Sequence, residues 1–207
     1  MTLIRAAFQL FAEQGYEGTS TREIAARAET NIASINYHFG GKAGLRLACA
    51  ETIIDRFEHL RKKPDLIQLP EGLQKPETEF EAALLRQAII VLGLEEAQLI
   101  MRFLLREAQE EGEVFDHVYK HFFNPVFTFF YQLFLQATQR ADEEEKREEL
   151  KIVIFSIISM LAYFRIAEPV ILRHQNWPAY QSEQTELMLR VLQGNIRGIV
   201  ANYRRKT

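Results

Sequence analysis

The sequence has little of what small proteins use to stabilise a fold without a large core. Its 207 residues include a single cysteine, Cys49, which can form no intrachain disulfide and is typical of a reduced, intracellular protein. Six prolines and ten glycines are too few for a fibrous or low-complexity chain. A net charge of −3 excludes a polycation, so any binding to nucleic acid must use a local surface.

Long hydrophobic runs are also missing. The most apolar stretch, residues 152–164, contains two serines and runs into Arg165, whereas a membrane span needs about 20 apolar residues. Residues 1–11 are amphipathic and lack the charged, apolar and small-residue succession of a signal peptide. We therefore expect a cytoplasmic protein that has no membrane partner.

What is present is the composition of an ordinary globular chain, with 47% hydrophobic and 26% charged residues. A domain near this size can bury roughly 70% of its unfolded surface, so it needs neither disulfides nor a metal. Turn signals divide the chain into blocks with helical spacing of apolar residues. Since no block alternates as a strand does and no repeat is found, the sequence predicts an all-α fold.

The first three predicted helices are short. In the first, apolar residues at helical spacing end at two glycines. These residues are Ile4, Phe8, Phe11, Gly15 and Gly18. Ser20 and Glu23 form a capping-box pattern that starts a second, brief helix. Ile32, Ile35 and Phe39 repeat at helical spacing, and we expect them to point inward from the third.

A fourth helix is predicted from Lys42 to about Arg61, long enough at about 1.5 Å per residue to be a strut of about 30 Å. Residues 62–76 hold three of the six prolines and are predicted to be a linker or irregular loop. Further helices are predicted at residues 77–92, 95–111, 114–123, 125–140, 143–168 and 182–203.

Three short helices, with a tight polar turn between the second and third, are typical of a helix-turn-helix whose later helix enters the DNA major groove. The individual residues make the pattern more specific. They are Phe8-x2-Phe11-x3-Gly15-Tyr16-x2-Thr19-Ser20-Thr21-Arg22-Glu23-Ile24-Ala25 and Ile32-Ala33-Ser34-Ile35-Asn36-Tyr37-His38-Phe39-x2-Lys42-x2-Leu45. This stretch, nearly continuous over residues 3–47, resembles the DNA-binding domain of the TetR family of bacterial repressors. The resemblance implies a DNA-binding domain over residues 1–48 and a helical effector-binding and dimerisation domain over residues 49–207.

The chemistry of these side chains agrees with the DNA contacts that the resemblance implies. Arg22 suits a phosphate or a bidentate contact with guanine, Asn36 suits a base edge, and Lys42 suits a phosphate at a helix amino terminus. The predicted DNA-binding residues are Thr21, Arg22, Thr30, Asn31, Ala33, Ser34, Asn36, Tyr37, His38 and Lys42. Taken singly, Tyr37 could be an ordinary half-buried aromatic and His38 a surface histidine. Residues 1–50 carry five basic and four acidic residues, so binding must depend on their placement.

The rest of the chain carries 20 basic and 24 acidic residues, a balance that repels DNA. Seven of the fifteen phenylalanines lie between residues 115 and 134, and apolar residues cover opposing faces of the helix at 125–140, so we expect that helix to be enclosed. Two interpretations stay open: a plain core, or a cavity for an apolar ligand. TetR-like regulators place an effector pocket in this region, and the effector-binding residues predicted on that basis are Phe103, Tyr119, Phe123, Phe127, Phe130, Tyr131, Tyr163 and Arg165. Arg165 would anchor an acidic group of the ligand or pair with Glu168.

Neither a metal nor a cofactor is expected. His117 and His121 lack a third ligand of matching spacing. No motif brings together a nucleophile, a base and an orienting group, so we do not expect an enzyme.

The last helices are predicted to form an association surface. Two glycines spaced by four inside the final helix each cost about 1 kcal/mol relative to alanine, which favours close approach of another helix. In TetR-like proteins the two C-terminal helices pack against the partner's pair as a four-helix bundle. The predicted dimer-interface residues are Ile158, Leu161, Leu187, Val191, Gly194 and Gly198. The alternative is packing within one chain.

Residues 31–39, with residues 163–173 and Trp177, also resemble the CecR (CerR-like) branch, which is linked to the control of transport and drug-sensitivity genes. The sequence therefore predicts a homodimeric repressor in the bacterial cytoplasm, associated with the nucleoid. Its partners would be operator DNA and a small, largely apolar effector. Two alternatives remain: a small-molecule carrier or enzyme that uses the aromatic cavity, and a DNA-bound structural protein without an effector.

Overall fold

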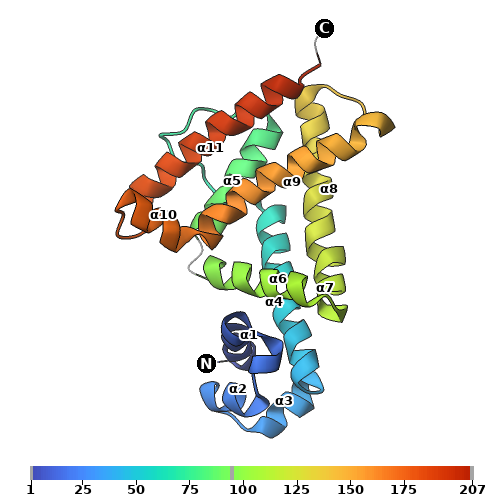
Figure 1. Cartoon of the computed structure of the whole chain (residues 1–207), viewed down its shortest axis with the longest axis vertical. Coiled ribbons are helices and arrows are strands. Elements are labelled where there is room, and N and C mark those ends of the chain that lie inside the picture. Colours follow the sequence, from blue (N-terminus) through green and yellow to red (C-terminus); the bar gives the residue numbers. More distant parts are fainter. Residues whose placement is uncertain (1, 94–95, 206–207) are drawn as a thin grey trace. The chain divides into compact units, whose positions relative to one another are not determined.

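The computed structural model describes residues 2–93 and 96–205, which hold helices and no strand (Figure 1). The predicted all-α fold is confirmed. The helices form two compact units, each with its own core. The N-terminal unit consists of Met1–Lys62 with Gln98–Phe123, and the C-terminal unit of Lys63–Ala97 with Asn124–Thr207. The domain boundary expected after residue 48 falls inside a helix, and residues 98–123 pack with the N-terminal unit.

The amino-terminal helices begin and end close to the predicted residues. They are α1 (Leu3–Gly18), α2 (Thr21–Arg27), α3 (Ile32–Phe39) and α4 (Lys42–Lys62). Ser20 accepts from the Glu23 N–H, and the Glu23 carboxylate accepts from the Ser20 N–H, so the predicted capping box is confirmed. These bonds from Ser20 also lower the pKa of the Glu23 carboxyl. The helices enclose Phe11, Ile24 and Ile35, all buried.

The junction between α3 and α4 requires glycine. A Cβ on Gly44 would lie 1.8 Å from the Phe39 carbonyl oxygen, a separation that no pair of non-bonded atoms tolerates. The missing side chain therefore lets the first turn of α4 pack directly against the end of α3.

The N-terminal unit is completed by α6 (Ala97–Glu110), α7 (Glu113–Val118) and the π-helix η2 (Tyr119–Phe123). The sequence predicted one regular helix where α7 and η2 lie. Pro125, just after η2, has no N–H for the His121 carbonyl, and its ring would crowd that oxygen in a regular helix. This accounts for the change from α-helix to π-helix there.

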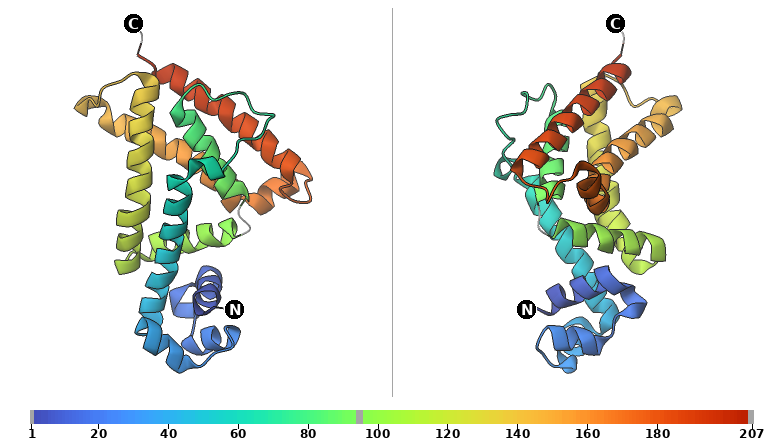
Figure 2. Two further views of the ribbon diagram at one scale, coloured as in Figure 1. Left: turned by 180° about the vertical axis from the view of Figure 1, so that it is seen from behind. Right: turned by 60° about the vertical axis from the view of Figure 1, so that its left-hand side comes forward.

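In the C-terminal unit the central helix is α5 (Glu79–Gly93), which packs against α8 (Asn124–Thr138), α9 (Glu144–Ile166) and α11 (Ser182–Tyr203), as Figures 1 and 2 show. The core includes Phe80, Leu84, Phe134 and Leu189. The expectation that residues 125–140 form the enclosed helix is therefore corrected. In α8, Phe130 and Phe134 face the core while Thr128 is exposed, whereas α5 is buried over most of its surface.

The sequence predicted one helix at residues 143–168 and no further helix before residue 182. The structure ends α9 at Ile166 and starts α10 (Glu168–Gln175) after a bend of 72°. Pro169 in the first turn of α10 cannot continue the α9 hydrogen-bond ladder, which explains the break. Among the residues described, no single helix is long and apolar enough to cross a membrane, and only the bent α9–α10 pair together meets that length and composition.

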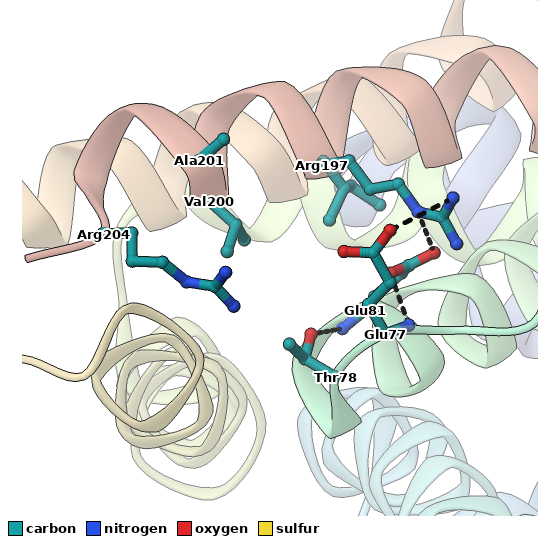
Figure 3. A pocket seen from close by; sticks show the side chains of 8 residues that line it. Glu77, Thr78, Glu81, Arg197, Val200, Ala201 and Arg204 are labelled. Carbon is teal, nitrogen blue, oxygen red and sulfur yellow. Dashed lines mark hydrogen bonds and ion pairs between the residues drawn. The ribbon is translucent and has the colours of Figure 1, made fainter.

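The segment between α4 and α5 is fixed to α11 by a polar cluster (Figure 3). Glu81, 1% exposed, accepts hydrogen bonds from Gln193 Nε2 at 2.7 Å and from Arg197 Nε at 2.9 Å. Gln193 also donates to the Gln74 carbonyl, and Arg197 to the Lys75 carbonyl. The predicted linker is thus an ordered strap rather than a free connection.

Candidate nucleic-acid interface

The outward side of α3 presents polar and small side chains. We call the exposed or half-exposed residues of this surface the recognition face, and they are Thr30, Asn31, Ala33, Ser34, Asn36, Tyr37 and His38. Tyr37 is 85% exposed, so it is not a half-buried core aromatic. Its ring meets that of His38 edge-on at 4.9 Å. Ile35, on the opposite side of α3, is fully buried and fixes this orientation.

Two local hydrogen bonds order the start of α3. Asn31 caps the helix by accepting from the Ala33 N–H at 2.9 Å, which leaves its amide NH₂ facing outward. The Thr30 and Ser34 hydroxyls lie 3.4 Å apart. Asn31 therefore has both a structural role and a donor group on the recognition face.

Ile32 departs from the expectation that it points inward. It is 39% exposed. As the first residue of α3 its Cβ points back toward the amino terminus of the helix, away from the core that Ile35 enters. Ile32 is therefore an apolar edge of the recognition face.

Residues at the start of α2 flank this surface. Arg22 is exposed, and Thr21 is half-buried at the first helical position. Arg27, farther along the same helix, pairs with Glu13 at 3.5 Å. Arg22, in contrast, lies in the first turn of α2, where the helix dipole favours an anion.

Lys42 lies at the start of α4, as the sequence predicted, but its ammonium has protein partners. It donates to the Tyr16 carbonyl at 2.6 Å and to the Thr19 carbonyl at 2.8 Å, and lies 4.0 Å from the centre of the Tyr16 ring. Two of its three N–H groups thus satisfy carbonyls at the end of α1. In the structure Lys42 therefore joins α4 to α1, and its contact with a phosphate stays a prediction.

An open groove of about 630 Å³ runs beside the recognition face. It is lined by Thr30 and His38 on one side and by Leu3 and Ile4 in the first turn of α1 on the other. The unbonded N–H groups of that turn make this side of the N-terminal unit favourable for a phosphate.

The predicted effector residues are divided between the two units. Phe103, Tyr119 and Phe123 belong to the N-terminal unit, and the other five to the C-terminal unit. Phe103 is fully buried, with its ring 5.4 Å from that of Phe8, and is core of the N-terminal unit. Tyr119 is exposed, and Phe123 is half-buried.

Within the C-terminal unit the predicted effector residues have different surroundings. Phe130 is core, and the buried Tyr131 hydroxyl donates to Asp142 at 2.6 Å. Burial, together with that bond, raises the pKa of Tyr131 to about 12. Arg165 lies 3.2 Å from Glu168, the pairing that the sequence left open. Contact of these residues with an effector stays a prediction.

The predicted dimer residues fall on both sides of their helices. Leu187, Val191, Gly194 and Gly198 are exposed on one side of α11. Leu161 is 2% exposed within the core of the C-terminal unit and cannot meet a partner. Ile158 is half-buried against that core. The exposed side of α9 is instead formed by Ile152, Phe155, Ser156, Tyr163 and Ile166.

The exposed side of α9 borders an apolar groove of about 560 Å³, to which α11 contributes Leu192 and Asn195. Phe155, Met160, Tyr163 and Leu192 line it. Phe127, predicted for the effector pocket, stacks on Phe155 with ring centres 5.5 Å apart. Tyr163 is 62% exposed and lies on this surface, a position that the sequence did not indicate.

The His117 and His121 rings lie 4.5 Å apart. In the part of the chain that the structure describes, no three histidine, cysteine, aspartate or glutamate side chains are grouped so that they could hold a metal ion.

Comparison with known proteins agrees with this geometry. Residues 3–49 match the family model described as bacterial regulatory proteins, tetR family, and residues 76–202 match the C-terminal domain of the HTH-type transcriptional dual regulator CecR. The chain is 31% identical over 191 residues to the HTH-type transcriptional dual regulator CecR of Shigella flexneri, and the match covers 90% of this chain and 84% of that protein.

Solved structures share the fold. A transcriptional regulator from Pseudomonas aeruginosa PAO1 matches 98% of this chain and 90% of its own, with a TM-score of 0.63 and 21% identity. A TetR-family member from Streptomyces coelicolor A3 matches 100% of this chain and 92% of its own, with a TM-score of 0.61 and 19% identity. At these identities the likeness concerns the fold alone.

Proposed function

Because the chain belongs to the TetR family of bacterial regulatory proteins and carries a CecR-type C-terminal domain, we propose that it is a homodimeric, ligand-responsive repressor of transcription. The observation that supports DNA recognition most directly is the recognition face. Its side chains point away from the core on α3, while Ile35 is buried in the core on the other side of that helix. The helix thus has a polar surface available to the major groove.

In the proposed complex with DNA, α3 lies in the major groove, and the small side chains of Ala33 and Ser34 allow the helix to approach the bases closely. Asn36 reads a base edge, since an amide can donate to and accept from adenine. Tyr37, His38 and Arg22 contact phosphates, which positions the helix without reading sequence. The second protomer inserts its own α3 one helical turn away, so the operator is a rough palindrome with half-sites about 34 to 36 Å apart.

Dimerisation in this proposal uses the exposed sides of α9 and α11. They carry large apolar side chains that are half or more exposed, including Phe155, Tyr163 and Val191. A Cβ added to Gly194 or Gly198 would meet no atom within 4 Å, so the chain itself gives no packing reason for glycine there. Close approach of a partner helix would supply that reason.

The proposed effector is a small, largely apolar molecule held in the aromatic region of the C-terminal unit. If it binds the conformation that separates the two recognition helices more tightly than the DNA-competent one, occupancy lowers the affinity for DNA. A coupling of about 1 to 3 kcal/mol is typical of such regulators. We place the protein in the bacterial cytoplasm on the nucleoid, with transport or drug-sensitivity genes as its targets; its relative from Shigella flexneri is named a dual regulator, so activation at some promoters is compatible.

The test is selection of bound duplexes from a random DNA library, followed by anisotropy titrations of the selected and a scrambled duplex across salt concentrations. We expect a palindromic site, nanomolar affinity and a steep loss of binding with salt. Asn36→Ala should weaken binding to the selected duplex about tenfold or more, since a base contact contributes about 1 to 3 kcal/mol. The matched control is Gln132→Ala, at an exposed position of α8. Equal binding to both duplexes by the unaltered protein would contradict the proposal and favour a DNA-bound structural protein, and no binding to either duplex would favour a small-molecule carrier.

A further inference from the structure

The N-terminal unit contains a polar cluster that the proposed DNA contacts do not use. It lies where the second half of α6 meets the end of α1 and the start of α4, all within this unit. We call it the α6 clamp, and it consists of Tyr16, Lys42, Arg46, Arg106, Glu107 and Glu110.

Arg106 donates hydrogen bonds to backbone carbonyls near the carboxyl end of α1. Its Nε donates to the Ala12 carbonyl at 3.0 Å and its Nη2 to the Glu13 carbonyl at 2.9 Å. These carbonyls lie just before the helical hydrogen bonds are interrupted at Gly15, so they are among those that a helix end leaves without partners. A guanidinium here also complements the negative end of the helix dipole.

Gly15 makes room for this contact. Its φ of 79° lies in the left-handed region that favours glycine, and a Cβ there would be 3.0 Å from Arg106 Nη1. The missing side chain thus permits both the break in α1 and the approach of the guanidinium from α6.

A second set of contacts ties α6 to α4. Arg46 Nε donates to Glu107 Oε1 at 2.7 Å, and Arg46 also pairs with Glu110. The Tyr16 ring is contacted by Lys42 Nζ at 4.0 Å and by the Arg46 guanidinium at 4.7 Å from its centre. The end of α1 is therefore held from α4 and α6 together.

The contacts of Arg106 and those of Arg46 differ in how completely their polar atoms are hydrogen-bonded. Both carbonyl contacts of Arg106 are well formed, whereas Glu107 is 2% exposed and its Oε2 has no hydrogen-bond partner. A buried carboxylate with one bonded oxygen retains part of its desolvation cost. The Arg46–Glu107 contact is thus the more easily released of the two.

Resting on the proposed function, we propose that Arg106 is a positioning residue for DNA recognition: through α1, on which α2 packs, it sets the orientation of the helix-turn-helix. The Arg46–Glu107 pair is the more easily released of the contacts that hold α6 against α1 and α4. The DNA-binding body of this protein therefore includes the second half of α6, far outside residues 3–49 in sequence.

The test compares Arg106→Gln with Arg102→Gln, an exposed arginine one turn earlier on α6. The probes are the duplex that the unaltered protein selects from a random library and a scrambled duplex of equal length. Arg106→Gln should lower affinity for the selected duplex about tenfold, within the range of typical couplings, and leave the scrambled duplex and the melting temperature unchanged. Arg106→Lys should recover part of the loss, because it keeps a donor near the carbonyls. Amide exchange at residues 15–19 should accelerate in Arg106→Gln alone.

Three results would overturn the proposal. In the first, Arg106→Gln matches Arg102→Gln in both DNA affinity and amide exchange. In the second, Arg106→Gln weakens binding to both duplexes equally, as a general loss of structure would. In the third, Arg106→Gln does not fold and Arg106→Lys binds the selected duplex as the unaltered protein does. If the unaltered protein selects no sequence, the proposed function fails, while the exchange measurement still decides whether Arg106 holds the end of α1.

Discussion

At the scale of single residues, the turn before the recognition helix contains a conformational cost. Glu29 has a φ of 55°, in the left-handed region, and it is exposed next to Thr30. A residue other than glycine pays about 1 kcal/mol or more for this conformation. Its carboxylate also adds negative charge next to a surface that is proposed to meet phosphates.

We predict that Glu29→Gly raises the free energy of unfolding by about 0.5 to 1 kcal/mol and tightens binding to any duplex. The stability gain follows from relief of the backbone cost, and the DNA effect from loss of charge. Chemical denaturation and anisotropy measure the two effects separately. Glu29→Gln is the matched control, since it removes the charge and keeps the backbone cost; a stability gain of the same size in Glu29→Gln would contradict the explanation.

Glu107 gives a second residue-scale prediction, for pH. Burial raises the pKa of this carboxyl, the bond from Arg46 opposing the shift. A raised pKa means that the folded state holds the proton more tightly than the unfolded one, so the contribution to stability is present below the unfolded pKa near 4.5 and is lost as pH rises through the folded pKa.

We therefore expect Glu107→Gln to be least different from the unaltered protein near pH 4.5 and to gain in relative stability as pH rises toward 7. Urea unfolding at a series of pH values measures this. Glu110→Gln is the control, because that carboxylate pairs with the same arginine but is more exposed. A relative stability of Glu107→Gln that stays constant over this range would count against the raised pKa.

At the scale of elements, the position of α5 depends on the Glu81 cluster (Figure 3). Glu81 is a buried charged residue in the first turn of a helix that is mostly apolar and central. The strap before α5 is fixed by the same groups, since Gln193 and Arg197 bond both to Glu81 and to strap carbonyls. One charged pair thus joins three elements: the strap, α5 and α11.

We predict that Arg197→Met destabilises the C-terminal unit by about 3 kcal/mol, because it leaves the Glu81 carboxylate buried without its cation. Arg190→Met, on the same helix, is the control: Arg190 and Glu186 are 4.0 Å apart and well exposed, so their pair contributes less than about 1 kcal/mol. Thermal unfolding of both variants measures the difference. Equal losses would show that the buried pair is not what secures the strap.

At the scale of the whole molecule, the proposed dimer depends on the exposed apolar residues of α9 and α11. Large apolar side chains such as Phe155, Tyr163 and Val191 are half or more exposed, and Phe155 and Tyr163 line one groove. A contiguous apolar surface of this kind is uncommon on a monomer. Two copies joined there would complete the four-helix interface proposed above.

We expect Val191→Glu to convert a dimer into a monomer, because the interface would have to bury an unpaired charge. Gly194→Leu should do the same for a steric reason, although the added side chain meets nothing within the chain. Size-exclusion chromatography with light scattering measures the mass. Gln136→Glu, at an exposed position of α8, is the control and should stay dimeric. Dimers in both α11 variants would mean that another surface joins the protomers.

What the sequence by itself determined is local. The capping box at Ser20, the glycine breaks and the limits of α1 to α4 and α11 depend on side chains a few residues apart, so they can be predicted from spacing. The 3.6-residue period likewise identified the polar side of α3. It put the end of the helix at 143–168 within two residues of the observed end of α9, but it did not indicate α10.

Only the tertiary structure decided which side of each helix meets the core and which distant charges meet each other. Leu161 and Tyr163 are two residues apart on α9, and packing against α5 buries the first and leaves the second exposed. Lys42 bonds to carbonyls 23 and 26 residues earlier, and Arg106 to carbonyls 93 and 94 residues earlier. Periodicity shows which residues share a face, but contacts over such separations depend on how the whole chain packs.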